Sequence, residues 1–300
     1  MLKKFRLLIA LLLALIVSVS PVVLPAAPAS ASILAVALES AASWLVGKGL
    51  DMLNDYMKSN TPEEIETKAG RGDPDAQFAL GCMYYFGDGK GKNFTYAAQW
   101  FRMAAENGHV YAQFNLGLMY DNGDGVSRDY AEAVKWYRKA ADQGDAKAQF
   151  NLGVMYSNGY GVRQDKAEAV KWYRKAAEQG QADAQNNLGV MYDNGEGVRQ
   201  DYAEAVKWYR KAADQGHAKA QSNLGWMYDN GYGVSRDYAE AVKWWHRAAE
   251  QGHTGAQFCL GVMYYYGYGV RQNKDETVRW WRKAVDQGDK QAIDALKQLQ

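Results

Sequence analysis

Histidine and carboxylate side chains are the groups in this chain that could bind a metal ion. His109, His217 and His253 are separated by multiples of 36 residues, and the other copies of that position carry Asp or Gln. A zinc site needs several converging ligands, and neither a Cys nor a second His stands at ligand spacing from these histidines. A position that accepts His, Asp and Gln is typical of a solvated helix cap. We expect His246, where other copies carry Arg, to be exposed as well.

The stretch from Asp121 to Glu132 has the outline of a calcium loop, with acids at its first and twelfth positions. Gly123 and Gly125 stand where side-chain oxygens are needed, and Val126 stands where that turn needs glycine. The Gly-x-Gly motif follows no strand, so it is not a nucleotide loop. Neither G-x-S-x-G nor H-E-x-x-H occurs. We therefore predict a protein with no catalytic residues, cofactor or metal.

These positions recur because the chain contains an internal repeat of 36 residues. The Leu-Gly pairs begin at Leu80, Leu116, Leu152, Leu188, Leu224 and Leu260, and the matching tryptophans are Trp100, Trp136, Trp172, Trp208, Trp244 and Trp280. A fixed period of this size indicates a solenoid.

The first half of each copy has the pattern of an amphipathic helix. In residues 112–120, Ala, Leu, Met and Tyr stand at positions i, i+4, i+7 and i+8, which share one helix face. Gly117 lies inside this helix at a cost of about 1 kcal/mol relative to Ala, so we expect another helix to approach closely there. Asn122 and Gly123 are predicted to end the helix, with Gly123 in the left-handed region.

The second half of each copy predicts a second helix. Asp129 can cap its start, and Glu132 can complete a capping box. The apolar face contains Ala133, Trp136, Tyr137 and Ala140, and Gln143-Gly144 ends the helix. The connections are short, so the two helices should be antiparallel, and their apolar faces are buried only when copies stack. The sequence therefore predicts an all-α solenoid of antiparallel helix pairs.

Composition excludes some classes of partner. The chain has 35 Lys and Arg against 34 Asp and Glu, and without Lys3, Lys4 and Arg6 the balance is 32 against 34. No basic stripe remains to neutralise phosphates, so we predict no binding to nucleic acid. Cys82 and Cys259 lie five repeats apart, too far to bridge within one molecule at roughly 10 Å for each helix layer. We expect both to be buried small hydrophobic residues, with pairing between molecules as the alternative.

The first thirty-one residues have the order of a secretory signal peptide. A basic start is followed by the apolar run Leu7 to Val19 and by small residues, with cleavage predicted near Ala31 or Ala29. The run is too short to favour a membrane span, although an uncleaved anchor is the alternative. We expect an exported monomer, periplasmic or secreted, without stable membrane insertion after cleavage.

The remaining chain divides at the repeat boundaries. Residues 32–60 predict an amphipathic helix that caps the first repeat. The alternative role of this helix is to bind a partner or a membrane surface. Thr61, Pro62 and Glu64 then supply an N-cap, an N1 proline and an N3 glutamate. The predicted segments are a truncated leading repeat helix at 61–72, six repeats at 73–108, 109–144, 145–180, 181–216, 217–252 and 253–288, and a C-terminal capping helix at 289–300.

Three motifs carry a family resemblance. The Ala-x-x-x-Leu-Gly-x-x-Tyr helix, the Gly-x-Gly-Val loop and the Asp-Tyr-Ala-Glu-Ala-x-x-Trp helix resemble the Sel-1-like repeat, a relative of the tetratricopeptide repeat. The resemblance covers about residues 73–296, and only the first copy, at Gly87 to Gly91, departs from the loop motif. It implies a right-handed superhelix that serves as an adaptor. Exported bacterial members resemble envelope scaffolds, regulators of envelope enzymes or sensors, and host-interaction factors, and the family shares no catalytic residues.

The resemblance also implies where a partner binds. In the tetratricopeptide relatives the first helices line a concave groove, and the corresponding columns here vary between copies, with aromatic ends and a polar, acidic middle. The candidate residues from these columns are Phe78, Tyr85, Phe86, Phe114, Phe150, Asn186, Asp193, Trp226, Asp229, Phe258, Tyr265 and Tyr266. Aromatic residues of this kind dominate binding hot spots.

Two further sets of residues stand beside these columns. The Asn ladder consists of Asn115, Asn151, Asn187 and Asn223, which the resemblance links to binding of a peptide backbone; the alternative is bonding to neighbouring helices. The loop tips carry Tyr160, Tyr232, Tyr268, Asp88, Asp124 and Glu196, which we interpret as solvated turns and, alternatively, as a second surface. The predicted function is a scaffold for a protein or peptide partner. The alternatives are an envelope regulator, a host-interaction factor and, least favoured, a cell-wall hydrolase.

Overall fold

The computed structural model describes residues 48–87 and 89–299, which form fifteen α-helices and no strand. The helices are α3 Lys48–Ser59, α4 Pro62–Gly70, α5 Pro74–Phe86, α6 Phe94–Glu106, α7 Val110–Asn122, α8 Tyr130–Asp142, α9 Ala146–Asn158, α10 Lys166–Glu178, α11 Ala182–Asn194, α12 Tyr202–Asp214, α13 Ala218–Asn230, α14 Tyr238–Glu250, α15 Thr254–Tyr266, α16 Lys274–Asp286 and α17 Lys290–Gln298. The predicted signal peptide at 1–31 and the first part of the predicted capping helix, 32–47, lie outside the described residues.

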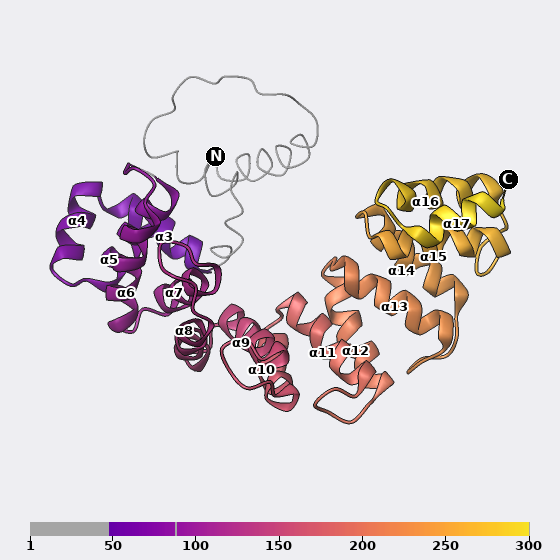
Figure 1. Cartoon of the computed structure of the whole chain (residues 1–300), viewed down its shortest axis with the longest axis horizontal. Coiled ribbons are helices and arrows are strands. Elements are labelled where there is room, and N and C mark those ends of the chain that lie inside the picture. Colours follow the sequence, from indigo (N-terminus) through magenta and orange to yellow (C-terminus); the bar gives the residue numbers. More distant parts are fainter. Residues whose placement is uncertain (1–47, 88, 300) are drawn as a thin grey trace, which may run out of the picture. The chain divides into compact units, whose positions relative to one another are not determined.

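From α5 to α16 the helices follow one another as pairs (Figure 1). Each first helix packs against the second helix of its own pair and against the second helix of the preceding pair. The buried clusters of the hydrophobic core correspondingly span neighbouring pairs. One buried cluster, for example, joins Tyr137 of α8, Leu152 of α9 and Trp172 of α10. The predicted fold class, an all-α solenoid of helix pairs, is confirmed.

A glycine in each first helix lets the second helix of the pair approach closely. A Cβ atom placed on Gly117 would lie 2.7 Å from the ring of Tyr137. Any larger side chain at this position would therefore displace that ring. The same contact occurs in every copy, between Gly81 and Phe101, Gly153 and Tyr173, Gly189 and Tyr209, Gly225 and Trp245, and Gly261 and Trp281. The predicted close approach at Gly117 is confirmed. The free energy gained by burying the ring offsets the cost of a glycine inside a helix.

A second glycine fixes the contact between successive pairs. Gly197 has φ +68°, and a Cβ atom there would lie 2.3 Å from the backbone carbon and oxygen of Lys166, at the start of the preceding pair's second helix. Gly125, Gly161, Gly233 and Gly269 make the same approach. Gly89 of the first copy also has positive φ, but its nearest neighbour would be the end of the flexible Met83 side chain, at 3.5 Å. The loop glycine therefore carries a packing role only where a preceding pair exists.

A buried glutamine connects three helices in every copy. The amide nitrogen of Gln185 donates to the carbonyl of Ala177 at the end of the preceding second helix, 3.0 Å away. Its amide oxygen accepts from Gln215, the residue that ends its own second helix, at 2.7 Å. The equivalent buried residues are Gln77, Gln113, Gln149, Gln221 and Gln257. Both ends of each buried amide are satisfied, which avoids the cost of burying an unpaired polar group.

The helix ends confirm most of the predicted caps. Gly123 ends α7 at φ 84°, and Thr61 and Glu64 form a complete capping box at the start of α4. The capping box predicted at Asp129 is wrong. Asp129 accepts from the backbone of Ala131 and Glu132, but its own N–H donates to the carbonyl of Tyr120, and Glu132 pairs with Lys135 instead.

The terminal helices cover the two ends of the described solenoid. Leu53 of α3 is buried in one cluster with Ile65 of α4 and Ala76 of α5, which is the contact expected of a capping helix. At the other end, Ala292 of α17 is buried beside Trp281, with Leu296 packed against the same cluster. Among the described helices, none is both long enough and apolar enough to cross a membrane.

The loop contact between pairs gives a stability prediction. Gly197→Ala and Gly89→Ala both place a side chain at positive φ, at a cost of roughly 1–2 kcal/mol. Gly197→Ala also forces a methyl group into backbone, so we expect it to lower the free energy of unfolding by about 1–3 kcal/mol more than Gly89→Ala. Urea unfolding followed by circular dichroism measures both. Equal losses would show that the loop does not hold neighbouring pairs together.

Candidate partner-binding groove

The first predicted binding column packs against neighbouring helices. Phe114 is buried with its ring 5.9 Å from the ring of Tyr137. Phe78 is buried with its ring stacked on that of His109, 4.4 Å away, and Asn186 is buried too. The equivalent contacts of the half-buried Phe150 and Phe258 are with Tyr173 and Trp281. This burial corrects the expectation for Phe78, Phe114 and Asn186, whose side chains offer almost no surface to a partner.

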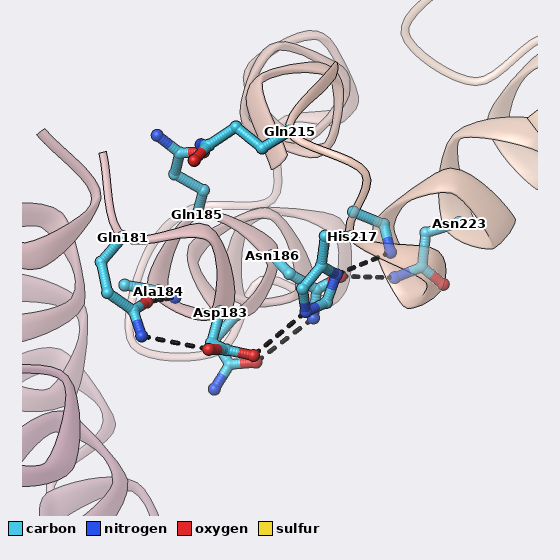
Figure 2. A network of polar contacts seen from close by, with 10 residues as sticks. Gln181, Asp183, Ala184, Gln185, Asn186, Gln215, His217 and Asn223 are labelled. Carbon is cyan, nitrogen blue, oxygen red and sulfur yellow. Dashed lines mark hydrogen bonds and ion pairs between the residues drawn. The ribbon is translucent and has the colours of Figure 1, made fainter. Parts of the chain in front are cut away.

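Three residues of the Asn ladder lie beside polar groups of neighbouring helices. Burial raises the pKa of Tyr137 and of Tyr173, and Asn151 and Asn187, which lie beside these hydroxyls, oppose that shift. Asn223 donates to the side-chain oxygen of Asn186, 3.2 Å away, as Figure 2 shows. These contacts favour the alternative role, but the three side chains are only half-buried, so their binding to a peptide backbone stays a prediction. Asn115, unlike the other three, is buried; its side chain has no hydrogen-bond partner among the described residues and is withdrawn from the surface.

The aspartates of the acidic column are half-buried, and two of them accept hydrogen bonds from tyrosine hydroxyls. The hydroxyl of Tyr137 donates to Asp121 at 3.2 Å, and that of Tyr209 donates to Asp193 at 3.1 Å. Burial raises the pKa of both carboxyl groups, and the tyrosine bonds oppose this shift. Burial also raises the pKa of Asp229, with Arg236 opposing it through its charge. The column therefore presents carboxylates that have lost part of their hydration.

Four of the loop-tip residues, three tyrosines and Glu196, contact the preceding pair. The ring of Tyr232 stacks on that of Tyr202, with centroids 4.9 Å apart. In the copy where the preceding second helix begins with Lys166, the tip residue is Glu196, and the two side chains form an ion pair at 2.9 Å. Tyr160 and Tyr268 make the same stacks on Tyr130 and Tyr238. The tips are thus packed as well as exposed, which corrects their interpretation as simple solvated turns. Asp88 lies outside the described residues.

An open groove of about 470 Å³ lies between α13 and α15. Its lining residues are Trp226, Asp229, Asn230, Arg236, Tyr238, Trp245, Phe258, Cys259, Val262, Met263, Tyr266 and Tyr268. Four predicted residues, Trp226, Asp229, Phe258 and Tyr266, therefore meet in one place. Tyr265 adjoins them through ring contacts with Tyr266 and Trp281. The aromatic residues at the other end, Tyr85 and Phe86, are half-buried against each other and Tyr85 also packs on Phe94.

The first-helix columns missed part of this groove. Arg236 and Tyr238 come from the loop and start of α14, and Trp245 from its middle. A signal for Trp245 was present in the sequence, because copy 5 has Trp at the position where copies 2 to 4 have Tyr. It could be assigned to the groove only once the packing of α14 against α13 and α15 was known.

The groove contains the thiol of Cys259, which its surroundings keep protonated. Burial, followed by the charges of Asp229 and Asp289, raises the pKa of the Cys259 thiol to about 12, so the reactive thiolate is not formed at neutral pH. Cys82 is buried, and both cysteines are free. Within the described part of the chain, no three His, Cys, Asp or Glu residues converge as metal ligands.

The helix-cap histidines are more buried than the sequence predicted. His109 and His217 accept backbone N–H groups at the starts of α7 and α13, so the predicted cap is confirmed. The side chain of His109 is only 5% exposed, however, so that cap is not solvated. His217 lies 3.1 Å from Asp183 in the contact drawn in Figure 2. His246 is partly exposed and lies 3.4 Å from Glu250.

Comparison with known proteins identifies the repeat. The Sel1 repeat profile matches residues 74–109, 110–145, 146–181, 182–217, 218–253 and 254–289. The chain belongs to the Sel1 repeat family. Sel1 repeat proteins typically serve as protein–protein interaction scaffolds and are generally non-enzymatic. No curated protein matches the chain.

Two solved Sel1-type structures are similar to this chain. One is a protective antigen present in uropathogenic Escherichia coli strains that displays an SLR fold, with 45% identity and a TM-score of 0.74 over 77% of this chain and 49% of the antigen. This chain therefore spans about half the length of that antigen. The other is a Sel1 repeat protein from Oxalobacter formigenes, with 36% identity and a TM-score of 0.67 over 78% of this chain and 95% of the other.

The buried cap at His109 gives a pH prediction. Burial lowers the pKa of His109 to about 4 from 6.5, so between these pH values the unfolded chain binds a proton that the folded chain does not. This contribution to the free energy of unfolding is complete above pH ~6.5 and is lost as pH falls toward ~4, by roughly 3 kcal/mol in total.

Gln181 caps the equivalent helix without titrating, so His109→Gln is the matched variant. Urea unfolding at pH 7 and at about pH 4.5 should show a smaller loss of stability in the variant than in the parent. An identical loss in both proteins would contradict the assignment.

Proposed function

We propose that this protein is an exported, non-enzymatic scaffold that holds a peptide or protein partner on the face formed by its first helices. The groove between α13 and α15 is the main contact. The observation that carries this proposal is the group of exposed aromatic side chains there. Trp226 is 43% exposed, Tyr265 38%, Tyr266 58% and Tyr268 46%.

Large exposed aromatic residues of this kind are costly to leave in water and contribute strongly to protein interfaces. Their rings are held by contacts with each other, which lowers the entropy lost on binding: Trp226 packs on Tyr232, and Tyr266 stacks on Tyr268. The half-buried Asp193 extends the same face toward the middle of the solenoid as a polar region. This distribution supports a binding mode in which the aromatic groove makes the strongest contacts with the partner and the polar region around Asp193 makes weaker ones.

A second candidate function is contact with a host molecule outside the cell. The observation that favours it is the 45% identity to a protein described as a protective antigen of uropathogenic Escherichia coli. The third candidate, regulation of an envelope enzyme or sensor, would use the same groove, with the bound enzyme as the partner.

The double variant Trp226→Ala, Tyr265→Ala tests the groove. The mature chain is used for affinity capture from the native cell envelope, followed by mass spectrometry of what binds. We expect the variant to lose the captured partner by about thirtyfold or more, which corresponds to a hot-spot loss of about 2 kcal/mol.

The matched control is Tyr96→Ala, Met103→Ala, which removes two exposed hydrophobic side chains from α6, 50% and 42% exposed. Both double variants should keep the helical circular dichroism of the parent. Unchanged capture by the groove variant would move the binding site to another face.

Export has its own test. Intact-mass spectrometry of the protein recovered from outside the cytoplasm should give a chain that begins at Ser32 or Ser30, after cleavage at one of the two small-residue sites. Recovery in the extracellular fraction would favour the host-contact function, and recovery in the periplasm would favour the envelope scaffold. A full-length chain confined to the cytoplasm would contradict export.

A further inference from the structure

The groove between α13 and α15 differs from the equivalent surface between α7 and α9. Both surfaces contain an aspartate and an arginine at matching positions, Asp229 with Arg236 and Asp121 with Arg128. Four other positions differ: Leu118, Tyr137, Asn151 and Asn158 in the earlier surface are Trp226, Trp245, Cys259 and Tyr266 in the later one. The repeat thus provides an internal comparison in which the charge is constant and the surroundings change.

The change from Tyr137 to Trp245 removes the hydrogen-bond donor of the aspartate. In the earlier surface the Tyr137 hydroxyl donates to Asp121 at 3.2 Å. The indole N–H of Trp245 instead donates to the backbone carbonyl of Ser222, 3.1 Å away. Among the described residues, Asp229 has no hydrogen-bond donor and no ion-pair partner within 4.0 Å. A desolvated carboxylate in this state gains strongly from a charged donor supplied by a ligand.

Aromatic rings line the same groove as this carboxylate. Trp226, Tyr238, Tyr266 and Tyr268 line the groove together with Asp229. Tyr238 and Tyr268 are stacked with centroids 5.1 Å apart, and Tyr268 stacks in turn on Tyr266 at 5.4 Å. The faces of aromatic rings carry negative potential and attract cations, and Trp is the most effective of them. The surface that gained two aromatic residues is therefore the one in which the aspartate lost its internal donor.

Arg236, the cation that lines the groove, does not fill this role. Its guanidinium group lies over the ring of Tyr238, 6.0 Å from the centroid, with a nitrogen 3.5 Å from the Tyr238 hydroxyl. It acts on Asp229 through its charge at longer range without a hydrogen bond. The carboxylate is left available to a second cation.

We infer that the groove between α13 and α15 binds a Lys or Arg side chain of an extended basic peptide segment, with Asp229 as the ion-pair acceptor and Trp226 and Tyr266 as the aromatic walls. This inference rests on the proposed scaffold function and names the chemistry of the partner. A neutral glycan or a proline-rich peptide would use the rings but would leave Asp229 without an ionic partner.

The test uses three fluorescein-labelled dodecapeptides of defined sequence: six Gly-Arg units, six Gly-Glu units and six Gly-Pro units. Fluorescence anisotropy measures their binding to the mature chain at about 0.15 M salt, with a chitooligosaccharide as a neutral glycan competitor. We expect the Gly-Arg peptide to bind and the other two to bind at least tenfold more weakly.

Asp229→Asn and Trp226→Leu locate the contact, and Asp121→Asn is the matched control. Asp229→Asn should weaken Gly-Arg binding by about tenfold or more, whereas Asp121→Asn, the same charge change in the earlier surface, should alter it by less than about twofold. Trp226→Leu, which installs the residue found at Leu118, should weaken binding by roughly three- to tenfold. Circular dichroism checks that each variant keeps its helicity.

Equal effects of Asp229→Asn and Asp121→Asn would overturn the inference, because they would indicate general charge attraction. Tighter binding of the Gly-Pro or Gly-Glu peptide than of the Gly-Arg peptide would also overturn the inference. The same holds if the glycan displaces the Gly-Arg peptide equally well from the parent and from the Asp229→Asn variant. If the Trp226→Ala, Tyr265→Ala variant still loses its captured partner in those cases, the scaffold function stands and the cation specificity fails. If capture is unaffected, the scaffold function itself fails at this groove.

Discussion

The contact between a ring and a glycine sets the geometry of every helix pair. With hydrogen as its side chain, the glycine of the first helix leaves a space that the Phe, Tyr or Trp of the second helix fills. The paired helices can then approach closely, and the residues on either side of the glycine take up fixed positions. Leu116 and Met119 point into the core, while Leu118 and Asp121 are left partly exposed. The face available to a partner is therefore a by-product of this packing contact.

The identity of the ring also controls the chemistry of that face. A tyrosine at this position places its hydroxyl beside the aspartate column, as Tyr137 and Tyr209 do. A tryptophan fills the same space, but it directs its N–H to a backbone carbonyl, as Trp245 and Trp281 do. A substitution that preserves packing thus changes whether a surface carboxylate is bonded within the protein. The packing of each pair and the chemistry of the candidate binding face are therefore coupled through one residue of each copy.

Contacts between copies show complementary pairs that single copies conceal. The loop tip and the start of the preceding second helix are Tyr with Tyr in three places and Glu with Lys in one. The buried glutamine of each first helix bonds across two neighbouring helices in the same way. Such nearest-neighbour contacts are what makes a stack of short helices stable, because each copy buries its apolar face only against the next. They also explain why polar residues such as the glutamines and Glu196 occupy positions that are packed between copies.

The sequence by itself determined the period, the helix pairs and most of the helix ends, because those depend on local spacing, on caps such as Thr61 and on glycines such as Gly123. It also pointed to Trp226, Asp229 and Tyr266, because variation between copies marks positions without a shared packing role. It misplaced Phe78, Phe114 and Asn186, since column alignment within a first helix does not reveal which residues a neighbouring helix covers. Only the tertiary structure decided that Trp245 and Tyr238 join the groove and that Asp229 lacks an internal donor. Those features depend on contacts between residues from different helices, and each distance is fixed by how the pairs pack.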